Sequence, residues 1–256
     1  MSSTRTLVLG ATGATGKHVV RMLLERGHKV RVVVRSKERM LQLVEKQKNI
    51  ENNLEIIESD LTSLNKKAYE NLVEGCDAIV SCLGHTLNGR GLCGLTDRRL
   101  VTNAVKSATA AVKSPKTKFI LMNSNGVANP NGQDDPRAVW ERGVVFLLRY
   151  LITPHADNEQ AAKHLHNLGK DVVEWCALRP NDLIEGEVSK YTFLSKPKKG
   201  MFGAGQTTRA NVAAAMVQLC LDEDNLWQTW KFKMPVVENI SEAKEGEDED
   251  EQEHAV

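Results

Sequence analysis

The chain has 256 residues, with 34 lysine and arginine residues against 33 aspartate and glutamate residues and a formal net charge of +1. This balance gives no overall attraction to nucleic acid or to an anionic membrane, and the length suits one large domain with a short extension. The five cysteines show no CxxC pair and no metal-ligand spacing. We therefore expect reduced thiols, no bound metal and a cytoplasmic compartment, with no signal peptide and no membrane span.

The first predicted strand, Thr4–Leu9, leads directly into three glycines at three-residue spacing, Gly10, Gly13 and Gly16. Apolar residues at helical spacing follow, and Gly27 closes that helix. A strand that enters a glycine turn and a helix N-terminus presents main-chain N–H groups and the positive end of the helix dipole to an anion. A P-loop is excluded, because it has four residues between its glycines and then Lys-Ser/Thr. The pattern predicts a cradle for a dinucleotide pyrophosphate.

The second predicted strand, Val30–Val34, is followed by Arg35. An acidic residue at this place binds the ribose hydroxyls of NAD, whereas a basic residue suits the additional 2′-phosphate of NADP. Because no carboxylate occurs before Glu38, we expect NADP(H) as the cofactor. A solvated strand end is the alternative interpretation of Arg35.

Two further strands end in residues suited to the same ligand. Asp60 and Leu61 follow the strand Leu54–Glu58, at the sheet edge where open α/β proteins bind ligands. The Asp60 carboxylate either accepts from the adenine amino group or caps the next turn, and the sequence leaves both roles open. The strand Asp77–Leu83 ends at Gly84, where a glycine allows the main chain to approach the cofactor ribose and pyrophosphate.

The fifth predicted strand, Lys118–Met122, ends in Asn-Ser-Asn-Gly-Val. The Ser124 hydroxyl would face the nicotinamide and hydrogen-bond a substrate carbonyl or the cofactor carboxamide; a turn cap is the alternative. His155 begins a predicted helix, His155–Leu168, as a candidate weak acid or as a capping or surface histidine. The other expected elements are helices at 37–48, 69–73, 97–112, 137–152 and 208–221, strands at 172–178, 191–194 and 230–234, and a glycine-rich loop at 85–95.

Strands and helices thus alternate five times at intervals of ~20–30 residues, which is typical of a doubly wound parallel sheet. We expect an α/β, Rossmann-type fold in which residues 1–240 form a single NAD(P)-binding domain with a small C-terminal substrate region. Residues 241–256 contain eight acidic residues and one lysine, a net charge of −7 that leaves +8 on the rest of the chain. We expect this tail to be disordered, as a solvated end or as a segment that binds a protein partner.

Together these motifs resemble the atypical short-chain dehydrogenase/reductase superfamily in its NAD(P)-binding, NmrA-like branch, and within it the flavin reductase/biliverdin-IXβ reductase group most. The resemblance runs to about residue 237. The stretches that carry it are GATGATG at 10–16, VRVVVR at 30–35, SDL at 59–61, CLG at 82–84, NSNGV at 123–127, EWCALRP at 174–180 and TTRANVAAAMVQL at 207–219.

The resemblance implies an extended NADP(H) site. Arg35 would bind the 2′-phosphate, and Ser124 matches the serine that follows the fifth strand. The remaining implied contacts are the glycine turn with the main chain of Thr12, Gly13, Ala14 and Thr15 for the pyrophosphate, Asp60 and Leu61 for the adenine, and Leu83 and Gly84 for the nicotinamide ribose.

One departure from the superfamily bears on function. Standard members use a Tyr-x-x-x-Lys pair to pass a proton at the substrate carbonyl, whereas Tyr150 here is followed four residues later by Pro154. Flavin reductase-type members also lack the pair. The resemblance therefore implies hydride transfer from NADPH to a small conjugated acceptor such as a flavin, quinone or tetrapyrrole, with Ser124 and His155 as catalytic candidates. The alternative is a non-catalytic, NADP(H)-sensing regulatory or assembly protein of NmrA type.

Overall fold

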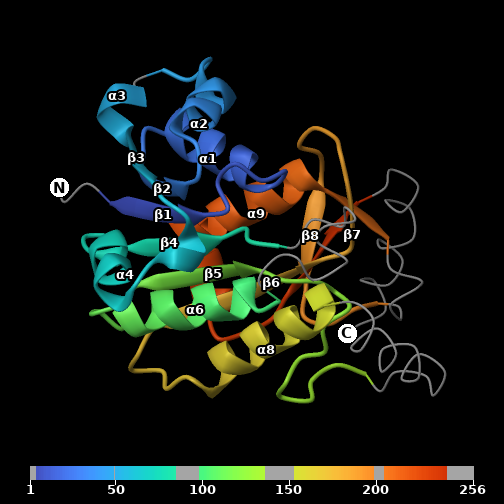
Figure 1. Ribbon diagram of the computed structural model, residues 1–256. Helices are drawn as coiled ribbons and strands as arrows, with labels where there is room; N and C mark the ends of the chain where they lie inside the picture. Colours follow the sequence, from blue (N-terminus) through green and yellow to red (C-terminus); the bar gives the residue numbers. More distant parts are fainter. Residues whose placement is uncertain (1–3, 49, 85–97, 136–152, 199–204, 241–256) are drawn as a thin grey trace.

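In a computed structural model that describes residues 4–48, 50–84, 98–135, 153–198 and 205–240, helices cover both faces of a mostly parallel sheet (Figure 1). The eight strands have the order β3-β2-β1-β4-β5-β6-β10-β8, and within it only the β10–β8 pair is antiparallel. The predicted α/β, Rossmann-type fold is confirmed. The strands are β1 (Arg5–Leu9), β2 (Lys29–Val34), β3 (Leu54–Glu58), β4 (Ala78–Ser81), β5 (Lys118–Met122), β6 (Glu174–Pro180), β8 (Tyr191–Leu194) and β10 (Val236–Asn239), with β7 (Asp182–Ile184) and β9 (Gln206–Thr208) in a separate two-stranded sheet.

Two apolar clusters, one on each face of the sheet, form the core. Successive residues of a strand point to opposite faces, so Val80 packs in one cluster and Ile79 in the other. Burial on both faces explains why the strands read as continuous apolar runs. The first face holds α1 (Gly16–Glu25), α2 (Lys37–Val44) and α9 (Arg209–Leu221), and the second holds α4 (Lys66–Val73), α6 (Leu100–Ala111) and α8 (Thr153–Asn167).

The strand order reverses at β1, which pairs with β2 on one side and β4 on the other. Leu9, the last residue of β1, lies opposite Val33 in β2 and Ser81 in β4. Ligands of open α/β sheets bind outside the carboxyl ends of the strands at such a reversal. The topology therefore indicates that a ligand would bind beside the residues that follow β1 and β4.

The C-terminal part differs most from expectation. The predicted strand at 230–234 is wrong, because α10 (Leu226–Trp230) is a helical turn and the last strand is β10. Leu226, Trp227 and Trp230 follow a helical rather than an alternating spacing, and Trp227 is buried by it. The helix expected at 37–48 ends at Val44, and a separate short helix, α3 (Ile50–Asn53), follows. The helix expected at 137–152 and the loop at 85–95 lie outside the described residues.

The described cysteines, Cys76, Cys82, Cys176 and Cys220, are free and buried. Burial raises the pKa of Cys76 and Cys220 to about 11 and that of Cys82 to about 12, so these thiols stay protonated at neutral pH. Over the described ranges, no cluster of His, Cys, Asp and Glu side chains is suited to a metal ion. None of the helices in this part of the chain has the length and apolar character that crossing a bilayer requires.

Candidate functional site

The glycine turn after β1 has geometry that larger residues would disturb. Gly10 has φ +77°, and a Cβ added there would lie 2.9 Å from the main-chain carbonyl of Cys82, just beyond β4. A Cβ on Gly16 would overlap the carbonyl oxygen of Gly10, which accepts from the Gly13 N–H at 2.9 Å. The turn therefore packs against β4, and α1 begins in direct contact with the turn. These are the roles that the glycines of a dinucleotide-binding turn perform.

The N-terminus of α1 is suited to an anion. Thr15 is the N-cap residue, and within the described structure its side chain makes no capping hydrogen bond. No acidic residue occupies the first turn of this helix. A helix start without a capping side chain or carboxylate leaves its N–H groups and its dipole available to a phosphate.

The ends of β2 and β3 bring Arg35 and Asp60 together. Arg35 is exposed, and Asp60 caps the short helix η1 (Leu61–Ser63) by accepting from the Thr62 N–H at 2.9 Å. The hydrogen bonds from Thr62, with a further contribution from the positive charge of Arg35, lower the pKa of Asp60. The capping role that the sequence left open for Asp60 is thus present, while its contact with adenine stays a prediction.

Two carboxylates lie among the positive charges next to Arg35. Ser36 caps α2 by accepting from the Arg39 N–H at 3.1 Å, and its hydroxyl donates to Glu38 at 3.0 Å. The Lys37 N–H donates to Glu58 of β3 at 3.1 Å. The segment after β2 therefore carries the positive charges of Arg35 and Lys37 beside the carboxylates of Glu38 and Glu58.

The end of β4 lies beside the glycine turn. The Gly10 contact with Cys82 and with the Leu83 main chain fixes this proximity. A Cβ placed on Gly84 would meet no atom within 4 Å, so the space beside this residue is open among the described residues. Leu83 is half-buried and packs against the second apolar cluster.

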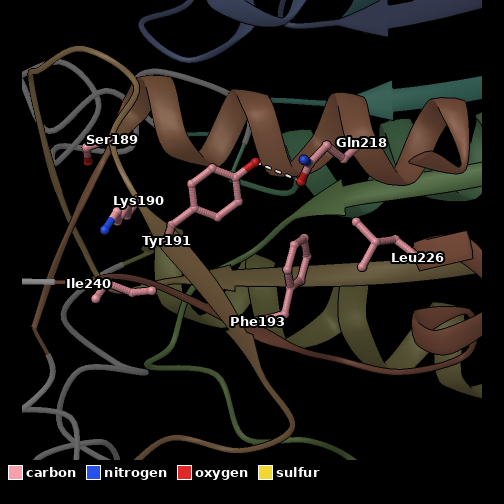
Figure 2. A pocket seen from close by; sticks show the side chains of 7 residues that line it. All are labelled: Ser189, Lys190, Tyr191, Phe193, Gln218, Leu226 and Ile240. Carbon is pink, nitrogen blue, oxygen red and sulfur yellow. Dashed lines mark hydrogen bonds between the residues drawn. The ribbon is translucent and has the colours of Figure 1, made fainter. Parts of the chain in front are cut away.

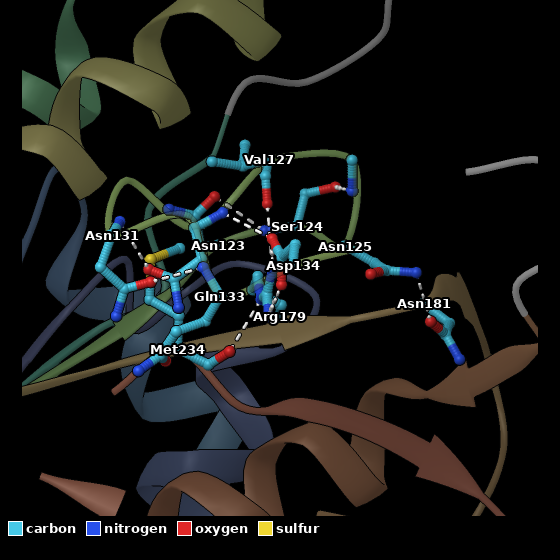
Figure 3. Close-up of polar contacts among 12 residues, drawn as sticks. Asn123, Ser124, Asn125, Val127, Asn131, Gln133, Asp134, Arg179, Asn181 and Met234 are labelled. Atoms are coloured by element: carbon cyan, nitrogen blue, oxygen red, sulfur yellow. Dashed lines mark hydrogen bonds and ion pairs between the residues drawn. The ribbon is translucent and has the colours of Figure 1, made fainter. Parts of the chain in front are cut away.

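Polar residues extend the pairing of β5 and β6 past the ends of these strands (Figure 3). The N–H groups of Asn123 and Asn125 donate to the carbonyls of Leu178 and Pro180 at 2.8 and 3.0 Å. The Ser124 hydroxyl oxygen accepts from the Gly126 N–H at 3.1 Å. The turn-capping role left open for Ser124 is therefore present, and its hydroxyl proton is still a potential donor.

A buried ion pair, which the sequence analysis did not identify, holds the loop after β5. Arg179 is 0% exposed and contacts both carboxylate oxygens of Asp134, at 2.7 and 3.0 Å. Its guanidinium also donates to the carbonyls of Val127 at 3.3 Å and Met234 at 2.8 Å, and Asp134 accepts from the Asn129 N–H at 2.6 Å (Figure 3). This bidentate pair fastens the segment 127–134 to the end of β6.

His155 lies in the first turn of α8, and this helix is tied to the end of β5. Asn123 Nδ2 donates to the carbonyl of Asn158 at 3.2 Å. His155 Nε2 lies 3.5 Å from Glu159 Oε1, and the two side chains are only 11% and 10% exposed. From the same helix, the buried carboxylate of Asp157 accepts from the N–H groups at the start of α6.

Three buried side-chain atoms of the described residues have no hydrogen-bond partner, and all belong to one end of the fold. They are Ser81 Oγ, Asn125 Oδ1 and His155 Nε2. Ser81 ends β4, Asn125 follows β5, and His155 begins α8. Because buried polar groups are normally paired, each of these atoms is a candidate for a hydrogen bond to a ligand or to water.

The carboxyl edge thus gathers nearly all the predicted site residues. The turn Gly10–Gly16, Arg35, Asp60, Leu83 and Ser124 follow strands of one sheet, and His155 joins them through α8. The roles of these residues in binding or catalysis stay predictions. The structure adds Asn125, Asn181 and the Arg179–Asp134 pair. The sequence contained one signal for this ion pair, the arginine inside the apolar run WCALRP. A buried guanidinium requires an acidic partner.

A hollow of about 380 Å³ lies elsewhere, between β8, α9 and α10 (Figure 2). Tyr191 and Phe193 of β8 line it, and the Tyr191 hydroxyl donates to Gln218 of α9 at 2.8 Å. None of the residues predicted to bind the cofactor lines this hollow. The carboxyl edge of the sheet therefore remains the candidate site.

A parallel sheet with a glycine turn and a helix N-terminus at its strand reversal defines a dinucleotide-binding protein of the Rossmann type. The sequence comparison makes this more specific. The chain belongs to the NAD(P)H-binding family, whose model matches residues 10–223.

Known proteins with similar sequence or structure include several reductases. The chain is 32% identical over 130 residues to the chloroplastic divinyl chlorophyllide a 8-vinyl-reductase of Arabidopsis thaliana, a match that covers 48% of this chain but only 30% of the plant protein. A Lactobacillus casei structure has a TM-score of 0.67 at 19% identity, with 93% and 100% of the two chains covered. An anaerobillin reductase from Escherichia coli O157:H7 has a TM-score of 0.63 at 16% identity, with 91% and 96% covered.

A proposed NADH-flavin reductase from Streptococcus pneumoniae matches with a TM-score of 0.61 at 20% identity, over 93% of this chain and 100% of that chain. At these identities the structural likeness establishes the fold. With the family match, it confirms the predicted resemblance to NAD(P)-binding proteins with flavin reductase-like neighbours.

Proposed function

We propose that the protein is an NADPH-dependent reductase that transfers hydride to a small conjugated acceptor, a flavin, quinone or linear tetrapyrrole. The observation that carries this proposal is the Gly10–Gly16 turn, which packs against Cys82 at the strand reversal and precedes an uncapped helix start. NADPH supplies the hydride when bound, and the chain has to hold and orient it beside an acceptor. The reductases among the similar proteins support the same reaction class.

The preference for NADPH rests on Arg35. This residue follows β2, is exposed, and is close enough to Asp60 for its charge to act on that carboxyl group. Arginine is well suited to bind a phosphate through several N–H groups at once. The positive charge of Arg35 would hold the 2′-phosphate despite the nearby carboxylates of Glu38 and Glu58.

Replacing Arg35 tests the preference. Arg35→Ala is expected to weaken NADPH binding by ~1.5–3 kcal/mol, since it removes a charge-assisted contact that NADH does not make. Isothermal titration with both cofactors measures this, and Lys29→Ala, at the opposite end of β2, is the matched loss of a positive charge. An equal loss of affinity for NADPH and NADH in the Arg35 variant would refute the assignment.

His155 is the proposed proton donor. Its ring is nearly buried, its Nε2 atom lies 3.5 Å from Glu159 Oε1 and makes no hydrogen bond within the described structure, and its helix is joined to Asn123 at the end of β5. Glu159 would orient the ring and balance the imidazolium charge. The Ser124 hydroxyl, on the neighbouring turn, would position the acceptor or the carboxamide of the cofactor.

We expect His155→Ala to lower kcat about tenfold, less than the ~10²–10⁴-fold that general acid catalysis usually contributes, because solvent also supplies protons. His166→Ala, which removes an exposed histidine from the same helix, should leave kcat unchanged. Steady-state NADPH oxidation from pH 5.5 to 8.5 measures both variants. The same kcat for the His155 variant and the wild type at every pH would exclude this role.

The reaction itself is tested by mixing the protein with NADPH and FMN, menadione, biliverdin or dichlorophenolindophenol and following absorbance at the NADPH band. Saturable oxidation that requires the folded protein is the expected result. If none of these acceptors accelerates NADPH oxidation above the protein-free rate, the proposed activity is wrong.

A second candidate, an NADP(H)-sensing protein without turnover, is favoured by one observation. The Ser124 oxygen already accepts from the Gly126 N–H, as a purely structural serine would. Such a protein needs the same cradle but no proton donor, and the acidic residues 241–256 would be available to a basic partner. Tight NADPH binding, no turnover, and a pull-down that changes between NADPH and NADP⁺ would distinguish it from the reductase.

A further inference from the structure

We propose that the side-chain amides of Asn125 and Asn181 form a recognition element for an amide edge, –NH–C(=O)–, on the acceptor. Such an edge is an imide or a lactam in a planar conjugated molecule. This inference rests on the proposed reductase function and makes its substrate class narrower.

The two amides leave one NH2 group and one carbonyl oxygen without a hydrogen bond. Asn125 Nδ2 donates to Asn181 Oδ1 at 2.9 Å, so the two side chains are joined by one hydrogen bond (Figure 3). Among the described residues, Asn125 Oδ1 is buried without a partner, and Asn181 Nδ2, which is not one of the buried unpaired atoms, donates to no residue. If both amides were turned over, the pair would still offer one NH2 group and one oxygen. The presence of one free NH2 group and one free oxygen therefore does not depend on how the two amides are oriented.

Asn125 Oδ1 is a buried hydrogen-bond acceptor that lacks a donor. Asn125 is only 7% exposed, and a buried acceptor without a hydrogen bond lowers the stability of the folded protein. Two neighbouring polar residues already have partners: Asn123 bonds to Ser124 and Asn158, and Arg179 donates to Asp134, Val127 and Met234. A ligand N–H directed at Asn125 Oδ1 would remove this penalty.

The position of the pair fits the acceptor rather than the adenosine half of the cofactor. Asn125 follows β5 and Asn181 directly follows β6, whereas Arg35 and Asp60 follow β2 and β3 on the other side of the strand reversal. An isoalloxazine or a bilin carries the N–H beside C=O that such a pair binds. A quinone carries only carbonyl oxygens and would leave Asn125 Oδ1 unpaired.

The test compares FMN with N3-methyl-FMN, which keeps the carbonyls and loses the N–H. With wild-type protein and NADPH, we expect kcat/KM to be about tenfold or more higher for FMN. In Asn125→Leu, of similar size, the two flavins should become equal. Asn131→Leu, an exposed position on the same loop, is the control. Asn181→Ala gives an independent reading if the Asn125 variant does not fold.

The flavin comparison has outcomes that would contradict the inference. Equal kcat/KM for the two flavins in the wild type, or a preference that persists in Asn125→Leu, overturns the inference. A change in NADPH affinity without a change in flavin discrimination also overturns it, because the pair would then contact the nicotinamide carboxamide. If no acceptor is reduced, the proposed activity fails, and fluorescence titration of the NADP⁺ complex with both flavins decides the inference alone.

Discussion

Asp134→Asn is expected to lower the free energy of unfolding by about 3–5 kcal/mol, because it leaves the buried guanidinium of Arg179 without a counter-charge. Arg179 is 0% exposed and makes two contacts with this carboxylate. The carboxylate also accepts from Asn129, so three hydrogen bonds are weakened together. Urea denaturation followed by circular dichroism measures the change.

The neighbouring residue provides the control. Asp135 forms a 2.8 Å ion pair with Lys196, but these side chains are 68% and 51% exposed. Exposed pairs contribute ~0–1 kcal/mol, so Asp135→Asn should hardly change stability. The two variants make the same chemical change at adjacent positions. Similar losses in both would show that burial of the Arg179 pair does not govern the stability of this segment.

The parts of the fold that sequence predicted well are those with strong local signals. The strands Leu54–Glu58 and Lys118–Met122 were predicted to the residue, because short apolar runs between polar turns leave little choice. The glycine turn was predicted with its packing roles, since few residues tolerate the φ of Gly10 or the space beside Gly16. The two-stranded sheet of β7 and β9 was missed, because its strands have three residues each and carry no periodic pattern.

The parts of the site that sequence did not predict depend on contacts between distant residues. Asp157 of α8 caps the start of α6, 56 residues earlier in the chain at Val101. Arg179 and Asp134 are 45 residues apart, and Asn125 and Asn181 are 56 apart. Each residue is unremarkable in its own segment. The packing of α8 against α6 and the order of β5 and β6 in the sheet, which local patterns do not determine, bring these groups together.

Gly16→Ala is expected to weaken binding of NADPH and NADH alike by about a hundredfold. The added Cβ would overlap the carbonyl oxygen of Gly10, which is main chain and cannot rotate away. The start of α1 would have to move relative to the turn, and losing one hydrogen bond to the charged pyrophosphate, worth ~1.5–3 kcal/mol, has an effect of about this size. Overpacking should also reduce stability by ~1–3 kcal/mol. Isothermal titration and urea denaturation measure the two effects separately.

Gly27→Ala, at the other end of the same helix, separates stability from binding. Gly27 has φ +73° and no atom within 4 Å of an added Cβ, so alanine there would be strained but not crowded. This strain should lower stability by ~1–2 kcal/mol and leave cofactor affinity unchanged. The two variants add the same methyl group, one at the start of α1 and the other just beyond its end. If Gly16→Ala bound NADPH as tightly as Gly27→Ala, the contact between the helix start and the glycine turn would not be what forms the pyrophosphate site.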